Sequence, residues 1–372
     1  MQNVSRRPFT FYEFFAGGGM ARLGLGADWE CLFANDRDSV KAATYRANFG
    51  ADHFRQADVF DLTIADLPSQ ADLAWASSPC QDLSLAGARA GLAGGRSSAF
   101  LGFWRLIEAL AAEGRTPPLV VVENVTGLLT SNGGKDFEAV CQGFVELGYR
   151  FGVIEIDAAH FVPQSRRRVL IVGAKTAPTR CAGGLETAAV GRAREALPVR
   201  LRRHWIDWPA DPPARRNLDL AALLEPDDRV QWRSKAQTDY LVSLMNPRHR
   251  ERLGMALASG HRQVGAVFRR VRQGVQRAEA RFDGLAGCLR TPRGGSSRQL
   301  LLITEGGVCR SRLITPREAA RLMGLPDDYR LPTGVTDALQ VAGDGVVVPV
   351  VAWLAREILA PLLARRQETP IS

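Results

Sequence analysis

Alternation of short apolar runs with helix-like segments between residues 9 and 173 is the feature that most constrains the fold. Residues 9–15 predict a buried strand, residues 16–19 a glycine turn, and residues 20–25 the start of a helix. The same order recurs up to a strand at residues 169–173. Strands that alternate with helices are typical of an α/β fold with a doubly wound, mostly parallel sheet and helices on both faces.

The positive charge of the chain is concentrated in one region. The net charge is +9, and residues 181–300 hold 22 Lys and Arg against 12 Asp and Glu, whereas the remainder holds 26 against 27. This region has prolines, scattered arginines and no clear hydrophobic period. With a length of 372 residues, this pattern indicates a second, smaller and irregular domain. A basic region beside a neutral one favours nucleic-acid binding, with an arginine-rich solvated surface as the alternative.

Cysteine usage and hydropathy indicate a soluble protein of a reducing compartment. The six cysteines form no C-x-x-C pair and show no regular spacing, so we expect neither a disulfide framework nor a metal site. Residues 1–10 are polar and basic and contain no apolar targeting segment. No apolar run approaches the ~20 residues of a membrane span. We therefore expect a cytoplasmic location.

One cysteine stands where a nucleophile would be presented. Cys80 follows Pro79 at the end of an apolar run, and a glycine-rich polar segment follows at residues 86–98. Proline fixes its own φ and pushes the preceding residue to an extended conformation, so the position of the thiol is largely preset. A lone cysteine is more often a small buried apolar residue. The catalytic interpretation needs partners elsewhere in the chain.

Acidic residues follow three of the predicted strands. Asp36, Asp58 and Glu123 each come at the end of an apolar run, and the carboxyl ends of parallel strands face the crevice where such sheets bind ligands. Asp36 suits a ribose hydroxyl pair, although it is equally placed to cap a helix. The glycine turn has Arg22 where G-x-G-x-x-G has its last glycine, so phosphate is not the first choice of ligand.

Two arginines precede the strand at residues 169–173. In an extended chain Arg166 and Arg168 point to the same face, where two guanidinium groups suit a phosphate or a carboxylate. A solvated basic edge is the alternative.

The ordered motifs resemble those of the DNA (cytosine-5) methyltransferases of bacterial restriction–modification systems. They occur in the order of that family and leave out only residues 175–300, where the family has its variable target-recognition region. The matching motifs are Phe15-Ala16-Gly17-Gly18-Gly19, Asn35-Asp36, Asp58, Pro79-Cys80-Gln81, Glu123-Asn124-Val125, Gln164-Ser165-Arg166-Arg167-Arg168, Thr315-Pro316-Arg317-Glu318 with Arg321-Leu322-Met323-Gly324, and Gly343-Asp344-Gly345-Val346 with Pro349-Val350.

The resemblance implies an AdoMet-dependent methyltransferase fold. Its catalytic domain would comprise residues 1–178 and 338–372, and its target-recognition domain residues 179–337. Phe15 would stack on the adenine of S-adenosyl-L-methionine (AdoMet), Asp36 would take the ribose hydroxyls, and Asp58 would face the adenine amine. Asp344 stands where the family commonly has Asn. The implied cofactor-binding residues are Phe15, Gly17, Gly19, Asp36, Asp58, Pro79, Asp344 and Val346.

The resemblance also implies the reaction. Cys80 would add to carbon 6 of a flipped-out cytosine, Glu123 would hold or donate a proton at N3, and Arg166 and Arg168 would position O2. No side chain stands out as the base that removes the carbon 5 proton; a water is possible. The implied DNA-binding residues are Gln81, Ser84, Arg96, Arg290, Arg293, Ser296 and Arg298.

The expected partner is double-stranded DNA, with a cognate restriction endonuclease acting on the same site without direct binding. We expect a monomer in the bacterial cytoplasm, close to the nucleoid. Three alternatives stay open: a tRNA cytosine-5 methyltransferase of the same fold, a catalytically silent DNA-binding regulator, and an NAD- or FAD-dependent oxidoreductase. The long basic insert favours DNA, the presence of Cys80, Glu123 and Arg166 disfavours the regulator, and the glycine spacing disfavours the oxidoreductase.

Overall fold

The computed structural model describes residues 7–78, 99–176, 185–272, 274–290 and 298–368. The chain divides into two compact units. The first comprises Met1–Ile156, Arg167–Pro213 and Val350–Ser372, and the second comprises Asp157–Arg166 and Ala214–Pro349.

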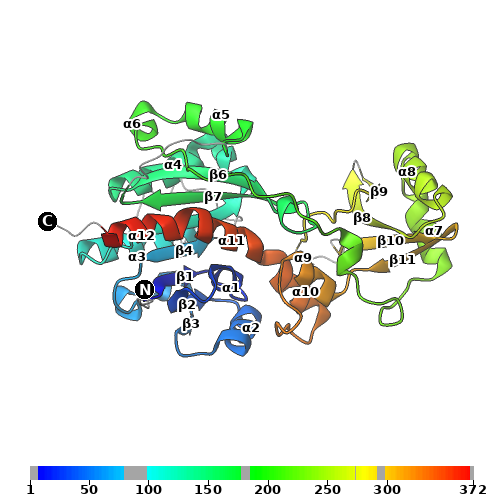
Figure 1. The fold of residues 1–372 in the computed structure, drawn as a ribbon, viewed down its shortest axis with the longest axis horizontal. Coiled ribbons are helices and arrows are strands. Elements are labelled where there is room, and N and C mark those ends of the chain that lie inside the picture. Colours follow the sequence, from blue (N-terminus) through cyan, green and yellow to red (C-terminus); the bar gives the residue numbers. More distant parts are fainter. Residues whose placement is uncertain (1–6, 79–98, 177–184, 273, 291–297, 369–372) are drawn as a thin grey trace, which may run out of the picture. The chain divides into compact units, whose positions relative to one another are not determined.

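The first unit is built on a seven-stranded sheet in the order β3-β2-β1-β4-β5-β7-β6 (Figure 1). The strands from β3 to β5 are parallel, and β7 runs antiparallel to β5. This confirms the doubly wound, mostly parallel sheet. The strands are β1 (Phe9–Phe14), β2 (Trp29–Asp36), β3 (Phe54–Gln56), β4 (Leu73–Ser77), β5 (Leu119–Val125), β6 (Arg150–Asp157) and β7 (Arg167–Ala174).

Helices follow several of these strands, and α2 begins at a side-chain cap. The Asp38 carboxylate accepts hydrogen bonds from the backbone N–H groups of Val40 and Lys41 at the start of α2. The helices are α1 (Met20–Leu25), α2 (Ser39–Phe49), α3 (Ala99–Ala112), α4 (Lys135–Glu146), α5 (Ala188–Ala196), α6 (Val199–Arg202), α11 (Val348–Leu354) and α12 (Ala360–Glu368). Short 3₁₀ turns lie at Val59–Asp61, Ile64–Asp66, Thr126–Leu129, Ser131–Gly134 and Ala158–His160, and a π turn lies at Ala355–Leu359.

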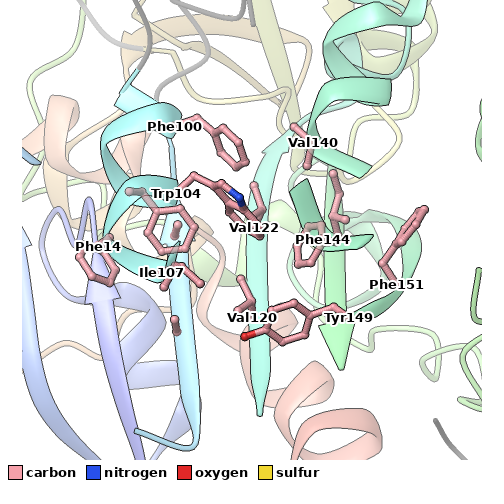
Figure 2. Packing of buried hydrophobic residues seen from close by; sticks show 14 of the residues in the cluster. Phe14, Phe100, Trp104, Ile107, Val120, Val122, Val140, Phe144, Tyr149 and Phe151 are labelled. Atoms are coloured by element: carbon pink, nitrogen blue, oxygen red, sulfur yellow. The ribbon is translucent and has the colours of Figure 1, made fainter. Parts of the chain in front are cut away.

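Aromatic side chains from α3 and α4 pack beside β5 in the core of this unit, as Figure 2 shows. The Trp104 ring stacks on Phe100 with centroids 5.5 Å apart and meets Phe144 edge-on at 5.0 Å. Full burial of each such side chain stabilises the fold by about 1.5–3 kcal/mol. The core therefore fixes β5, whose carboxyl end carries Glu123.

Residues 185–213 pack with the first unit, beyond the boundary at 178 expected from the sequence. Val190 and Leu201 pack in the same core cluster as Phe151. Phe151 also exchanges backbone hydrogen bonds with His204 and Ile206, which holds residues 204–206 beside β6. The lack of a clear period hid α5 and α6. At the other end, the first unit resumes at Val350 rather than at residue 338.

The second unit contains a four-stranded antiparallel sheet in the order β11-β10-β8-β9 (Figure 1), which the sequence did not predict. Residues 235–258 form two helices rather than one, because Asn246 caps a new helix with Pro247 in its first turn. The elements are α7 (Lys235–Ser243), α8 (Pro247–Ala258), β8 (Gln263–Arg272), β9 (Val275–Arg281), β10 (Leu300–Glu305), β11 (Val308–Leu313), α9 (Pro316–Leu322) and α10 (Val335–Asp344), with a 3₁₀ turn at Leu220–Leu223.

One run of helix among the described residues, Val335–Arg365, is long and apolar enough to cross a membrane by length and composition. This differs from the expectation that no segment approaches that length. Because 61% of its apolar window is buried inside the protein, the run is better explained as core helix.

Candidate active site

The glycine turn after β1 is tied to the end of β2. The Gly17 N–H donates to Asp36 Oδ2 at 2.9 Å, and the Ala16 N–H donates to the Asn35 carbonyl at 2.8 Å. Phe15 has φ 56°, a left-handed conformation that costs a non-glycine residue about 1–3 kcal/mol. Strain of this kind is typical of ligand sites. Phe15, Gly17 and Asp36, predicted from separate motifs, thus lie together.

The two predicted glycines of the turn differ in what surrounds them. A Cβ on Gly17 would meet no heavy atom of the described residues within 4 Å, so the backbone there leaves room for a ligand. A Cβ on Gly19 would lie 2.4 Å from the Phe49 ring. Gly19 is therefore required for close packing of the turn against α2, a structural reason that the sequence analysis did not give.

Asp36 is nearly buried, and each of its oxygens accepts a backbone hydrogen bond, Oδ2 from the glycine turn and Oδ1 from the segment after β2. Asp36 is 8% exposed, and its Oδ1 accepts from the Asp38 N–H at 2.9 Å. Burial raises the pKa of Asp36, while Lys41 and the two backbone N–H donors act in the opposite direction. Each oxygen keeps acceptor capacity beyond these single bonds.

Glu13 is a site residue that the sequence analysis did not select. It lies on β1 and is 1% exposed; Oε1 accepts from the Arg22 N–H at 3.3 Å, and Oε2 is buried with no hydrogen-bond partner among the described residues. Burial raises its pKa to about 8, against the lowering effect of Arg22. Asn35 Oδ1 is likewise buried without a partner in the described chain. A carboxylate in an otherwise aromatic strand was the signal available in the sequence.

Asp58 lies just beyond the end of β3. It caps a 3₁₀ turn, where Oδ1 accepts from the Phe60 N–H at 3.1 Å, and Oδ2 lies 3.4 Å from Arg37 Nη1. Arg37 is largely exposed, so this ion pair is of the weak surface kind. Asp58 thus keeps an acceptor accessible at the edge of the sheet.

The carboxyl ends of β4 and β5 and the amino end of the antiparallel β7 meet at Glu123. Ser77 pairs in register with Glu123, and Arg168 on β7 pairs with Val125. Arg168 Nε lies 3.1 Å from Glu123 Oε1, and both side chains are largely buried. A pair of this kind is expensive to break, because the remaining charge is left desolvated.

Asn124 connects this carboxylate to the chain that leaves β4. Its Nδ2 donates to the Ser78 carbonyl at 3.3 Å and to Ser78 Oγ at 3.1 Å. Ser78 is the residue before the Pro79-Cys80 motif. Several predicted residues lie outside the described ranges, namely Pro79, Cys80, Gln81, Ser84, Arg96, Arg293 and Ser296.

Arg166 and Arg168 have different partners, so the paired grip expected from their alternation does not form. Arg166 is 3% exposed and belongs to the second unit, where its guanidinium donates to the carbonyls of Leu289, Gly343 and Gly345. Asp344 is exposed between those glycines.

The second unit also carries the remaining arginines predicted to contact DNA. Arg290 is exposed, and Arg298 donates to Thr336 Oγ1 at 2.9 Å. Two further arginines, on the β8–β9 hairpin, were not predicted from the sequence. Arg270 and Arg277 stand directly opposite each other across the two strands, an arrangement of like charges that destabilises a sheet. Arg270 is paired with Glu279 at 3.5 Å, whereas the exposed Arg277 side chain makes no hydrogen bond or ion pair with the described residues.

The family model for C-5 cytosine-specific DNA methylases matches residues 9–360. The chain belongs to this family. Curated relatives include the type II methyltransferase M.NlaX of Neisseria lactamica, 26% identical over 362 residues that cover 96% of this chain and 98% of that relative. The type II methyltransferase M.HpaII of Haemophilus parainfluenzae is 28% identical over 375 residues, covering 96% and 91%. The expected family and enzyme class are thereby confirmed.

Solved structures of other methyltransferases have the same fold as this chain. The methyltransferase EhMeth of Entamoeba histolytica superposes with a TM-score of 0.61 at 15% identity and covers 96% of this chain and 99% of its own. The Dnmt2 methyltransferase of S. pombe gives a TM-score of 0.57 at 16% identity, with 95% and 99% covered. At such identities the likeness concerns the fold alone.

Membership of an AdoMet-dependent methyltransferase family implies AdoMet, and the residues at the turn after β1 fit that molecule. The backbone at Gly17 leaves room for a ligand, and acceptors for hydroxyl and ammonium donors are the Asp36 carboxylate, Glu13 Oε2 and Asn35 Oδ1, the last two having no hydrogen-bond partner among the described residues. The Asp36 carboxylate in this position would repel a pyrophosphate. The donor set therefore favours AdoMet over a dinucleotide.

Proposed function

We propose that this methylase transfers a methyl group from AdoMet to carbon 5 of a cytosine within a specific sequence of double-stranded DNA. The observation that carries the proposal is the buried Glu123–Arg168 pair, held beside the chain that leads from β4 to Pro79-Cys80. A desolvated carboxylate and guanidinium at the sheet edge where the parallel strands β4 and β5 end suit a polar, planar base. AdoMet supplies the electrophilic methyl group.

The cofactor would be held at the turn after β1. Phe15 would stack on the adenine, Gly17 and Gly19 would let the methionine moiety approach, and Asp36 would accept from the ribose hydroxyls. Asp58 would accept from the adenine amine, with Pro79, Asp344 and Val346 completing the contacts. We add Glu13, whose Oε2 has no partner in the described chain and suits the ammonium group of the methionine moiety.

Cys80 would act as the nucleophile. Its thiolate forms a bond to carbon 6 of the cytosine, and the electrons of the 5,6 double bond make carbon 5 nucleophilic. Glu123 holds or donates a proton at N3, which spreads the charge that the addition creates. Arg168 keeps the Glu123 carboxylate in place and positions O2. After methylation, carbon 5 loses its proton to a base, a role open to a water, and the thiolate leaves as the double bond re-forms.

DNA would be engaged largely by the second unit. A base inside a duplex is out of reach, so the cytosine must be flipped out at a cost of about a few kcal/mol. Gln81, Ser84 and Arg96 would contact the opened duplex, and Arg290, Arg293, Ser296 and Arg298 would contact the recognition sequence. The hairpin arginines Arg270 and Arg277 join this set, because their mutual repulsion is relieved by a phosphate between them. The relatives are named type II methyltransferases, which supports a place in a restriction–modification system. We further propose that a cognate endonuclease acts on the same DNA site and that the methylase is a monomer in the bacterial cytoplasm near the nucleoid.

Bisulfite sequencing of a plasmid from cells that express the chain tests this function. We expect every copy of one short sequence to carry a protected cytosine, and no protection in cells that express Cys80→Ser. Well-expressed protein without any protected cytosine would refute the proposal. DNA that contains 5-fluorocytosine should trap a covalent adduct with the wild type and none with Cys80→Ser. Transfer of labelled methyl groups to tRNA alone would favour the RNA-acting alternative.

A further inference from the structure

Arg166 joins three segments that are far apart in the sequence, all within the second unit. Its Nη1 donates to the Leu289 carbonyl at 3.1 Å, and its Nη2 donates to the carbonyls of Gly343 at 3.0 Å and Gly345 at 2.8 Å. We propose that Arg166 is a positioning residue that sets AdoMet affinity and DNA affinity together, rather than a contact to the cytosine. This rests on the proposed function of the segments it holds.

The bonds of Arg166 to the glycine carbonyls close the end of α10. The helix ends at Asp344 with Gly345 as its C-cap, and the last carbonyls of a helix have no partner within it. A cation there satisfies those carbonyls and is favoured by the partial negative charge of the helix C-terminus. The planar guanidinium reaches two segments at fixed angles, which an ammonium group cannot do. Arg166 therefore fixes the backbone on both sides of Asp344.

Residues next to Arg166 in the sequence hold it against the segment at residues 286–289. Its own N–H donates to Asp157 Oδ1 at 2.8 Å. The fully buried Gln164 accepts from the Leu289 N–H at 3.0 Å and donates to the Leu322 carbonyl at 2.8 Å. Ser165 and Pro163 exchange backbone hydrogen bonds with Ala286. Residues 163–166 are thus hydrogen-bonded along residues 286–289, and the Arg166 guanidinium connects this pair of segments to the end of α10.

The segments that Arg166 holds lead directly to proposed ligand contacts. Leu289 precedes Arg290, the first residue of the proposed DNA-contacting stretch, and Gly343 and Gly345 flank Asp344 and precede Val346. A contact from Arg166 to the cytosine would require a side chain that is 3% exposed to give up these carbonyls. Because the Arg166 guanidinium fixes both segments, binding of AdoMet stabilises the arrangement that DNA needs. The coupling is reciprocal, so binding of DNA strengthens binding of AdoMet by the same factor.

Steady-state kinetics of Arg166→Lys test the inference, because lysine keeps the charge and loses the fork. We expect KM for AdoMet and KM for DNA each to rise about tenfold, with kcat within about twofold of the wild type. The control is Arg167→Lys, whose side chain is 69% exposed and 4.0 Å from Glu155; it should leave all three constants unchanged. A fall in kcat at unchanged KM values would make Arg166 a base contact, and a rise in only one KM would remove the joint role; either result overturns the inference.

Calorimetry on the wild type provides a second measurement that does not depend on folding of the variant. S-adenosyl-L-homocysteine, which occupies the same site and has no methyl group to transfer, should bind several-fold more tightly in the presence of a DNA duplex that carries the target sequence than in its absence. Equal affinities would overturn the inference. Absence of any methylated product from the wild type would instead overturn the proposed function, so the two failures are distinguishable.

Discussion

The two units differ in where the side chains proposed to contact ligands lie. In the first unit, acids are buried at the carboxyl ends of strands, where Glu13, Asp36 and Glu123 are all less than 9% exposed. In the second unit, arginines such as Arg277 and Arg290 lie at the surface. A buried charge must have specific partners, whereas an exposed one contributes little alone and much in number. Chemistry should therefore depend on few residues of the first unit, and DNA affinity on many of the second.

The largest effect should come from the carboxylate at the end of β5. Glu123→Gln keeps the size of the side chain but removes its ability to hold a proton at N3, and we expect methylation to fall about 10²–10⁴-fold. Single-turnover transfer of labelled methyl groups measures this directly. Glu113→Gln is the control, because that side chain is 48% exposed and should leave the rate unchanged. A rate within threefold of the wild type for Glu123→Gln would remove this residue from the chemistry.

Loss of the buried Glu123–Arg168 pair should cost more folding stability than loss of the exposed Arg167 side chain next to it. Arg168→Ala removes the guanidinium that lies 3.1 Å from the largely buried Glu123 carboxylate, which should lower the free energy of unfolding by about 3 kcal/mol. Arg167→Ala removes a side chain that is 69% exposed and should change it by less than about 0.5 kcal/mol. Urea unfolding of the two variants checks both values. Equal losses would mean that the Glu123–Arg168 pair is screened like a surface contact.

The raised pKa of Glu13 makes the first unit sensitive to pH. With its pKa at about 8 in the folded protein and near 4.5 when unfolded, the folded state binds this proton more tightly. Stability without cofactor should therefore be greatest below pH 4.5 as far as Glu13 is concerned, fall between pH 4.5 and 8, and level off above. Asp36, also raised, adds a change of the same sign. The difference in Tm between the wild type and Glu13→Gln, followed from pH 5 to 8, isolates the contribution of Glu13; a constant difference would contradict it.

The same contrast explains what the sequence could predict. Gly17, Asp36 and Glu123 could be found because each follows an apolar run, and parallel strands bring their carboxyl ends to one edge. The bonds from Arg166 to Leu289 and Gly345 join residues more than a hundred positions apart, and no local pattern encodes them. The β8–β9 hairpin was missed for a different reason. Arginines and exposed valines, rather than a clean alternation, occupy its outer end, so a strand period was not visible.

The hairpin arginines should give the smallest effect and the sharpest test of distributed binding. Arg277→Ala should weaken DNA binding a few-fold and to the same extent for target and unrelated sequences, because a phosphate contact carries no sequence information. The slope of log affinity against log salt should fall by about 1. Lys235→Ala, at a side chain that is 88% exposed and paired with Asp239 on α7, is the matched control and should leave the slope unchanged. Because Arg270 loses a like charge opposite it, the variant should be no less stable than the wild type. A loss confined to the target sequence would instead make Arg277 a reader of base edges, and specificity would then extend from the 290–298 stretch to the hairpin.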